Sequence, residues 1–238
     1  MKQQSHSQSV TSVRYSPDAI HLATGAEDGL VKVWSCRSSS CIVTFNEHTC
    51  SVSAVCWTPS GKAILSASYD GTVRAHDLVR YRNFRTLLCP EQTQLSCLAV
   101  DGGGDLVMAG SHDLFNIFVW SLDNGRLLDV LSGHTAVLAS ISAHGNSLAS
   151  VSWDKSLRVW NVAEGSAPEI VTLVDEALAV AYSPCGLIIA VLTLDSTISL
   201  FDGTACSSQL GTIDTKLDVD PARSATDLIT KANSGKSK

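Results

Sequence analysis

The stretch LASVSWDKSLRVWN, residues 148–161, decides the fold because variants of it recur along the chain. It reads as a short apolar run, a turn at Asp154, and a second run that ends near Trp160. Four related stretches are LATGAEDGLVKVWS (22–35), LSASYDGTVRAHD (65–77), VMAGSHDLFNIFVWS (107–121) and VLTLDSTISLFD (191–202). Short runs of β-type residues around a polar turn predict a hairpin. The sequence therefore repeats one strand-turn-strand unit five times.

The turn aspartate and the bulky residue after it are both periodic. The aspartates are 41–43 residues apart and the bulky residues 40–44 apart: Asp28, Asp70, Asp113, Asp154 and Asp195, then Trp34, His76, Trp120, Trp160 and Phe201. A period near 40–45 with an aromatic residue at a strand end is typical of WD-repeat β-propellers. We therefore predict an all-β fold that resembles this family.

Each unit also has an earlier strand, such as VSAVCWTPSG (52–61), and a later one, such as FRTLLCP (84–90). We predict five four-stranded blades in a propeller domain at 1–214, at about 10–47, 52–90, 95–133, 137–175 and 177–214. Residues 215–238 are polar and are predicted to form a flexible loop or tail. Both ends favour a part of a larger propeller; the alternative is a short five-blade protein.

In WD-repeat proteins, a His, a Ser or Thr, the turn Asp and a Trp form a hydrogen-bond chain between strands. The resemblance implies this structural role for His6, Thr24, Asp28 and Trp34 in blade 1, and for His48, Ser66 or Ser68, and Asp70 in blade 2. It implies the same for Asp113 and Trp120 in blade 3, His134, Ser150 or Ser152, Asp154 and Trp160 in blade 4, and Asp195 in blade 5. His76 departs from the expected Trp. Blades 3 and 5 are incomplete, so we expect them to depend on packing.

The sequence does not predict catalysis. Its Ser, His and Asp residues fall on the repeat positions, where they bind each other, and no G-x-S-x-G motif is present. NSGKSK (233–238) resembles the end of a phosphate-binding loop, but Thr230 stands where that loop needs its first Gly. We therefore expect no enzyme, no catalytic residue, no cofactor and no small-molecule substrate.

Composition narrows the class further. A content of 45% hydrophobic and 17% charged residues is typical of a packed domain, and the formal net charge is −6. Eight cysteines without a C-x-x-C pair predict neither a metal site nor a disulfide framework. No apolar stretch is long enough to span a membrane. We expect an intracellular protein with reduced thiols, in which any nucleic-acid contact is local.

The stretch RYRNFRT (80–86) is the one place where cations and aromatic rings alternate. The candidate contacts for a partner or RNA are Arg74, Arg80, Tyr81, Arg82 and Arg85. Strand alternation puts Phe84, Thr86 and Leu88 on one face and Arg85 and Leu87 on the other, and we expect Phe84 to pack against the blade. A solvated rim is the alternative reading.

Several phrases are more specific than the repeat requires and resemble the periodic tryptophan protein 2 family. They are MKQQSH (1–6), DGTVRAHDLVRYRNFRT (70–86), FVWSLDNGRLLDVLSGH (118–134), SWDKSLRVWNV (152–162) and ARSATDLITKANSGK (222–236). The resemblance covers essentially the whole chain. Because that family has two tandem propellers, the resemblance implies a fragment of a longer protein.

The resemblance also implies a function. The family provides a non-enzymatic scaffold of the small-subunit processome in the nucleus and nucleolus, within a subcomplex of WD-repeat proteins. It works beside the U3 small nucleolar RNA and pre-rRNA, directly or indirectly, and supports 18S rRNA maturation. The alternative is a WD40 adaptor of another class, such as a ubiquitin-ligase substrate receptor or a signalling scaffold.

Overall fold

The computed structural model describes residues 5–165, 167–204 and 208–215, which form five four-stranded antiparallel sheets. Blade 1 contains β1 (Val10–Tyr15), β2 (His21–Ala26), β3 (Val31–Ser35) and β4 (Ser40–Phe45), and blade 2 contains β5 (Val52–Trp57), β6 (Ala63–Ser68), β7 (Thr72–Asp77) and β8 (Arg82–Leu88). Blade 3 contains β9 (Leu95–Val100), β10 (Leu106–Ser111), β11 (Ile117–Ser121) and β12 (Leu127–Leu131). Blade 4 contains β13 (Leu138–His144), β14 (Ser147–Ser152), β15 (Ser156–Asn161) and β16 (Glu169–Thr172). Blade 5 contains β17 (Ala177–Tyr182), β18 (Ile188–Thr193), β19 (Thr197–Asp202) and β20 (Gln209–Asp214). The tail predicted at 215–238 lies outside the described residues, apart from Thr215.

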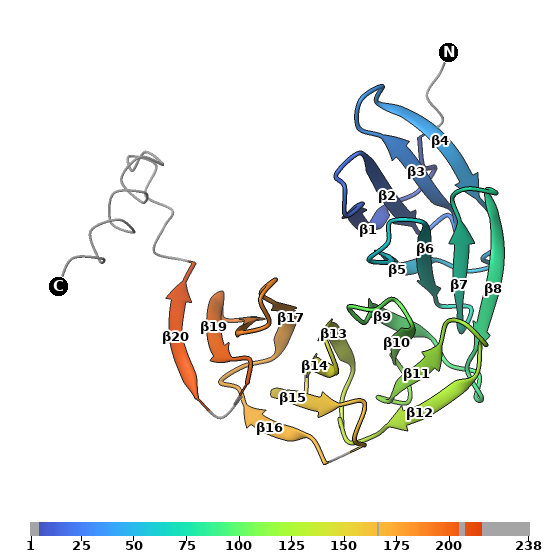
Figure 1. Ribbon diagram of the computed structural model, residues 1–238. Helices are drawn as coiled ribbons and strands as arrows, with labels where there is room; N and C mark the ends of the chain where they lie inside the picture. The colour runs from blue at the N-terminus through green and yellow to red at the C-terminus, as the bar shows by residue number, and fades with distance from the viewer. Residues whose placement is uncertain (1–4, 166, 205–207, 216–238) are drawn as a thin grey trace, which may run out of the picture.

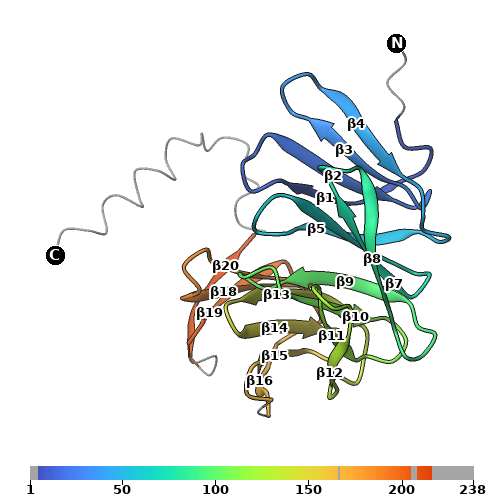
Figure 2. The same cartoon turned by 45° about the vertical axis from the view of Figure 1, so that its right-hand side comes forward.

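The five blades follow one another around an arc (Figure 1). The first strand of each blade lies on the inner side of the arc and the fourth strand on the outer side, as the turned view also shows (Figure 2). Strands pair only with their chain neighbours, in the order first to fourth, within every sheet. This is the predicted all-β propeller architecture, and the arc is open between blades 1 and 5.

The hydrophobic core lies between the blades. Residues of β2 and β3 pack against β5 and β6, and the same face-to-face packing recurs at the next three blade junctions. Blades 2, 3 and 4 are therefore covered on both faces by neighbouring blades. All six residues of β6 are buried, which explains why this strand reads as a continuous run of apolar and small residues rather than an alternating one.

Gly25 marks a position at which neighbouring blades approach closely. A Cβ atom built on Gly25 would lie 2.5 Å from Cγ1 of Val52 and 2.9 Å from Cγ1 of Val55, both on β5 of the next blade. Gly110 holds the matching position in β10, where a Cβ would lie 2.5 Å from Sγ of Cys97. Glycine at these two positions therefore lets the second strand come near its neighbours.

Substituting alanine for Gly25 is expected to destabilise the chain by about 1–3 kcal/mol, the usual cost of overpacking a core. The matched control is Gly211→Ala in β20, where an added Cβ would meet no atom within 4 Å. Urea denaturation of both variants checks this prediction. Equal midpoints for the two variants would show that the blade junction tolerates a methyl group at Gly25.

The outer strand β8 alternates as predicted, but the prediction for its buried face was wrong. Leu87 is fully buried, whereas Phe84 is 41% exposed and Leu88 is 65% exposed. The register explains this, because Leu87 and Arg85 lie opposite Val73 and Ala75, whose side chains face blade 3. Phe84 consequently lies on the surface.

Candidate functional site

Blade 4 contains the complete hydrogen-bond chain that the repeat predicts. Nε1 of Trp160 donates to Oγ of Ser150 at 2.8 Å, Ser150 lies 2.8 Å from Nε2 of His134, and Nδ1 of His134 lies 2.8 Å from Asp154. Burial lowers the pKa of His134, although Asp154 opposes this shift, so the imidazole is neutral at neutral pH. Its Nδ1–H therefore donates to Asp154, and its Nε2 accepts from Ser150.

Blade 1 has the same arrangement. Nε1 of Trp34 donates to Oγ1 of Thr24 at 2.9 Å, Thr24 lies 2.8 Å from Nε2 of His6, and Nδ1 of His6 lies 3.1 Å from Asp28. Burial raises the pKa of Asp28, but hydrogen bonds from the backbone N–H groups of Ser7 and Leu30 and from His6 outweigh it, and the net shift is downward. The aspartate is therefore an ionised acceptor that ends the chain.

Blade 2 differs at the position of the Trp. Nδ1 of His48 lies 2.8 Å from Asp70 and its Nε2 lies 2.8 Å from Oγ of Ser66, as in the other two blades. Nε2 of His76 lies 3.1 Å from Ser66, so an imidazole occupies the place of the indole. The His76 ring is fully buried and stacks on Phe45 with centroids 4.3 Å apart.

The imidazole of His76 brings a second ring nitrogen into the core. Nδ1 of His76 and Oε2 of Glu47 are both buried, lie 3.6 Å apart, and have no hydrogen-bond partner among the described residues. Burial, together with the nearby His48 and Arg74, lowers the pKa of His76 to about 3. The ring is therefore neutral at physiological pH.

Blades 3 and 5 lack the chain, since neither has the leading His and both have an apolar residue in place of the hydroxyl residue in the second strand. Ala109 and Val191 hold the positions that Thr24, Ser66 and Ser150 hold elsewhere. Trp120 in blade 3 instead donates from Nε1 to the carbonyl oxygen of Leu88 at 3.3 Å. The residue type at this position can be read from the sequence, and it separates the blades that have the hydrogen-bond chain from those that lack it.

The turn aspartates of these incomplete blades form other hydrogen bonds. Asp113 accepts from the backbone N–H of Gln94 at 3.3 Å and lies 3.1 Å from Nδ1 of the adjacent His112. Asp195 accepts from the hydroxyl of Thr193 at 2.6 Å and from Thr197. The turn aspartate thus keeps a capping role where the rest of the chain is missing.

The structure separates the five candidate contact residues into two groups. Arg80, Tyr81 and Arg82 are exposed around the turn between β7 and β8. Arg85 donates from Nη2 to the carbonyl oxygen of Asp123 in blade 3, and its Nε is buried. Arg74 is half-buried in β7. Of the five candidates, only Arg80, Tyr81 and Arg82 are exposed.

A hollow of about 290 Å³ lies beside that exposed turn. Its lining residues are Lys62, Ala63, Asp77, Val79, Arg80 and Phe84. Val79 is 76% exposed and Tyr81 is 54% exposed. The turn therefore presents apolar and aromatic side chains together with cations.

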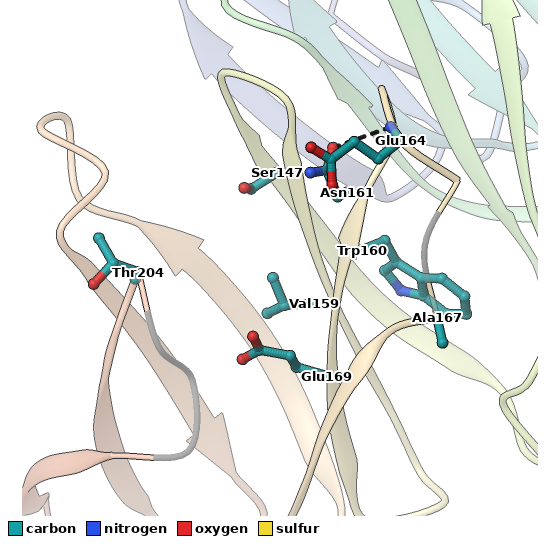
Figure 3. Close-up of a pocket in the computed structure, with 9 residues that line it drawn as sticks. Ser147, Val159, Trp160, Asn161, Glu164, Ala167, Glu169 and Thr204 are labelled. Carbon is teal, nitrogen blue, oxygen red and sulfur yellow. Dashed lines mark hydrogen bonds between the residues drawn. The ribbon is translucent and has the colours of Figure 1, made fainter.

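A second hollow, of about 270 Å³, lies between the outer strands of blade 4 and the loop after β19 (Figure 3). Glu164, Glu169 and Asn161 line it on the blade 4 side, and Thr204 lies on the blade 5 side. The backbone N–H of Glu164 donates to Oδ1 of Asn161 at 3.3 Å. This hollow is acidic where the first is basic.

The described residues hold seven free cysteines, and burial raises the pKa of the Cys56 thiol to about 12 and that of Cys97 to about 11. Within the same residues, no three His, Cys, Asp or Glu side chains are grouped so that they could hold a metal ion. No helix long and apolar enough to cross a membrane occurs in the described part of the chain.

Comparison with known protein families identifies the same repeat. A model for the WD domain, G-beta repeat, matches residues 1–35, 39–77 and 125–161. These segments end one residue after Trp34, His76 and Trp160, so they contain the residues of the three hydrogen-bond chains that are complete or have the His76 variant. Residues of blades 3 and 5, which lack the hydroxyl, fall largely outside the matched segments.

Curated relatives cover the whole chain. It is 57% identical over 238 residues to "Periodic tryptophan protein 2 homolog" of Caenorhabditis elegans, a match to 100% of this chain and 26% of that protein. It is 45% identical to the Mus musculus homolog and 44% identical to "Periodic tryptophan protein 2" of Saccharomyces cerevisiae, with the same coverage. The chain thus spans about a quarter of the length of these relatives.

Among solved structures, the chain is similar to "Structure of U3-55K", with a TM-score of 0.80 and 17% sequence identity. The match covers 89% of this chain and 66% of that one. At this level of identity the similarity shows the fold.

Proposed function

Because this chain is a WD40-repeat β-propeller chain of the periodic tryptophan protein 2 family, we propose that it serves as a non-enzymatic scaffold of the small-subunit processome. In this role it acts in the nucleolus and supports pre-rRNA processing and 18S rRNA maturation. The observation that carries the proposal is the similarity to curated members of that family along the entire chain. A fold alone would not support it, since propellers host many unrelated functions.

The described residues support binding rather than chemistry. The buried Ser, His and Asp side chains bond to one another at the strand junctions of blades 1, 2 and 4. The partners that we propose are other WD-repeat proteins of a processome subcomplex and, directly or indirectly, U3 small nucleolar RNA and pre-rRNA. Arg80, Tyr81 and Arg82 are the exposed contact residues of this proposal, while Arg74 is half-buried in β7 and Arg85 donates to the carbonyl oxygen of Asp123 in blade 3.

Affinity purification of the tagged full-length protein tests the function. We expect processome proteins, U3 RNA and pre-rRNA in the eluate, and depletion of the protein should lower 18S rRNA relative to the large-subunit rRNA. Purification without processome components, together with normal 18S levels after depletion, would exclude the proposal. Recovery of ubiquitin-ligase or signalling subunits would instead favour the adaptor alternative.

A further inference from the structure

The two hollows both border the turn that follows the third strand of a blade. In blade 2, Oδ1 of Asp77 accepts from the backbone N–H groups of Val79 and Arg80 at 2.7 and 3.3 Å. In blade 4, Oδ1 of Asn161 accepts from the two corresponding N–H groups, of Ala163 and Glu164, at 3.1 and 3.3 Å. The strand pairing agrees, because Ala63 lies opposite Asp77 and Ser147 opposite Asn161. The backbone scaffold of the two turns is therefore the same.

The side chains on this shared scaffold have opposite character. Blade 2 places Val79 and Arg80 where blade 4 places Ala163 and Glu164. Lys62 adds a second cation at the hollow of blade 2, and Phe84 adds an aromatic wall. The lining of the blade 2 hollow thus combines apolar side chains with two cations and the carboxylate of Asp77, although the chain as a whole carries a net charge of −6.

Tyr81 provides an independent observation. Its φ is +50°, in the left-handed region, and its blade 4 counterpart is Gly165 with a φ of +60°. The matching position in blade 3 is also a glycine, Gly125, with a φ of +72°. A tyrosine in this conformation is strained, whereas a glycine is not. Blade 1 also has a non-glycine residue at the matching position, Ser39 with a φ of +50°, so blade 2 is distinguished by placing an exposed aromatic side chain there.

We propose that the surface formed by Lys62, Val79, Arg80, Tyr81 and Arg82 binds an acidic protein segment with an apolar anchor residue. The anchor enters the hollow between Val79 and Phe84, and Asp or Glu side chains on either side of it face the cations. Arginine binds carboxylates through two parallel hydrogen bonds, which suits this arrangement. The proposal adds a class of partner to the scaffold function. It rests on that function only in assuming that the propeller binds proteins.

Two features favour a protein segment over RNA. Arg85 is bonded to Asp123 and Arg74 is half-buried, so neither extends the cationic surface along a phosphate backbone. The hollow, at about 290 Å³, holds one or two side chains rather than a run of nucleotides.

Selection of phage-displayed random peptides on the immobilised chain tests this inference, with counter-selection against the Val79→Ala/Arg80→Glu double variant. That variant gives blade 2 the side chains of blade 4 at these two exposed positions, so the fold is unaffected. We expect peptides rich in Asp and Glu around an aliphatic or aromatic residue, and about tenfold or more weaker binding of them by the variant. Arg37→Glu, in the same turn of blade 1, changes the net charge equally and should leave binding unaltered.

Tyr81→Gly separates a binding role from a structural one. The substitution relieves the strained φ, so the melting temperature should not fall, while peptide binding should weaken. Recovered peptides that lack acidic residues, or that bind the double variant equally well, would overturn the proposal, as would labelled oligouridylate binding that depends on Val79 and Arg80. If the peptides bind but the full-length protein does not co-purify with processome proteins, only the proposed scaffold function is rejected. If the protein co-purifies with processome proteins but the peptides do not bind, only the proposed binding surface is rejected.

Discussion

Replacing Trp160 with alanine is expected to lower the free energy of unfolding by about 3–5 kcal/mol, the usual cost of a large-to-small change in a core. Trp160 is 4% exposed and packs in the cluster between blades 3 and 4. The substitution removes this packing and also the N–H that donates to Ser150 at 2.8 Å. A cavity and an incomplete hydrogen-bond chain therefore act together in the variant.

The matched control is Trp153→Ala, at the turn between β14 and β15 of the same blade. Trp153 is 47% exposed, and surface substitutions of this kind usually change stability by no more than about 0.5 kcal/mol. Urea denaturation of both variants, with the parent chain alongside, measures the difference. If Trp160→Ala and Trp153→Ala unfold at the same urea concentration, the hydrogen-bond chain and the core around it do not hold blade 4 together.

The second large effect is a pH dependence of stability caused by His76. Burial lowers the pKa of His76 to about 3 in the folded chain, while an unfolded His titrates near 6.5. Below pH 6.5, His76 binds a proton in the unfolded chain but not in the folded chain, so the free energy of unfolding falls as the pH decreases. The slope approaches about 1.4 kcal/mol per pH unit, and the loss between pH 6.5 and 4 is about 3 kcal/mol.

The variant His76→Trp isolates this contribution. An indole does not titrate and its N–H can donate to Ser66, as Trp160 does to Ser150. Urea unfolding of both proteins at several pH values between 6.5 and 4 should give a difference in unfolding free energy that changes steadily with pH. The aspartates with lowered pKa values, such as Asp154, contribute equally to both proteins and at lower pH. Parallel pH profiles would show that His76 accepts a proton in the folded state.

The blade architecture could be predicted from sequence because its signals are local. A turn aspartate such as Asp154 accepts from the backbone N–H of Ser156 two residues later, and Trp160 lies near the end of a strand of the same hairpin. Both therefore recur at the repeat spacing regardless of what surrounds the blade. The two hydroxyl candidates in each repeat could not be separated in this way, because Ser150 and Ser152 share one face of the strand.

The hydrogen-bond distances show which of these two hydroxyls belongs to the chain with His134. Ser150 lies 2.8 Å from His134, whereas Ser152 donates to the carbonyl oxygen of Ala136 at 3.0 Å. Ser66 and Ser68 divide in the same way, since Ser68 donates to the carbonyl oxygen of Ser51 at 2.8 Å. The second serine thus closes the loop that precedes the blade, a role that the repeat pattern does not reveal.

Features that depend on contacts between two blades or between two distant strands could not be predicted from the sequence. Alternation along β8 defines two faces, but the bond from Arg85 to Asp123 in blade 3 and the packing of Leu87 determine which face is inside. The hollow near Phe84 needs Lys62 and Val79, which come together only when β6 pairs with β7. Non-local packing of this kind has no counterpart in a pattern of consecutive residues.

The imidazole of His76 gives blade 2 a freedom that blades 1 and 4 lack. An indole only donates, so Trp34 and Trp160 fix the order of donors and acceptors along their chains. An imidazole can donate or accept at Nε2. Nε2 of His76 donates to Ser66 when it carries the ring hydrogen and accepts when that hydrogen is on Nδ1, which faces Glu47. The direction of the Ser66–His76 hydrogen bond in blade 2 is thus set by a tautomer, whereas in blades 1 and 4 the residue type sets it.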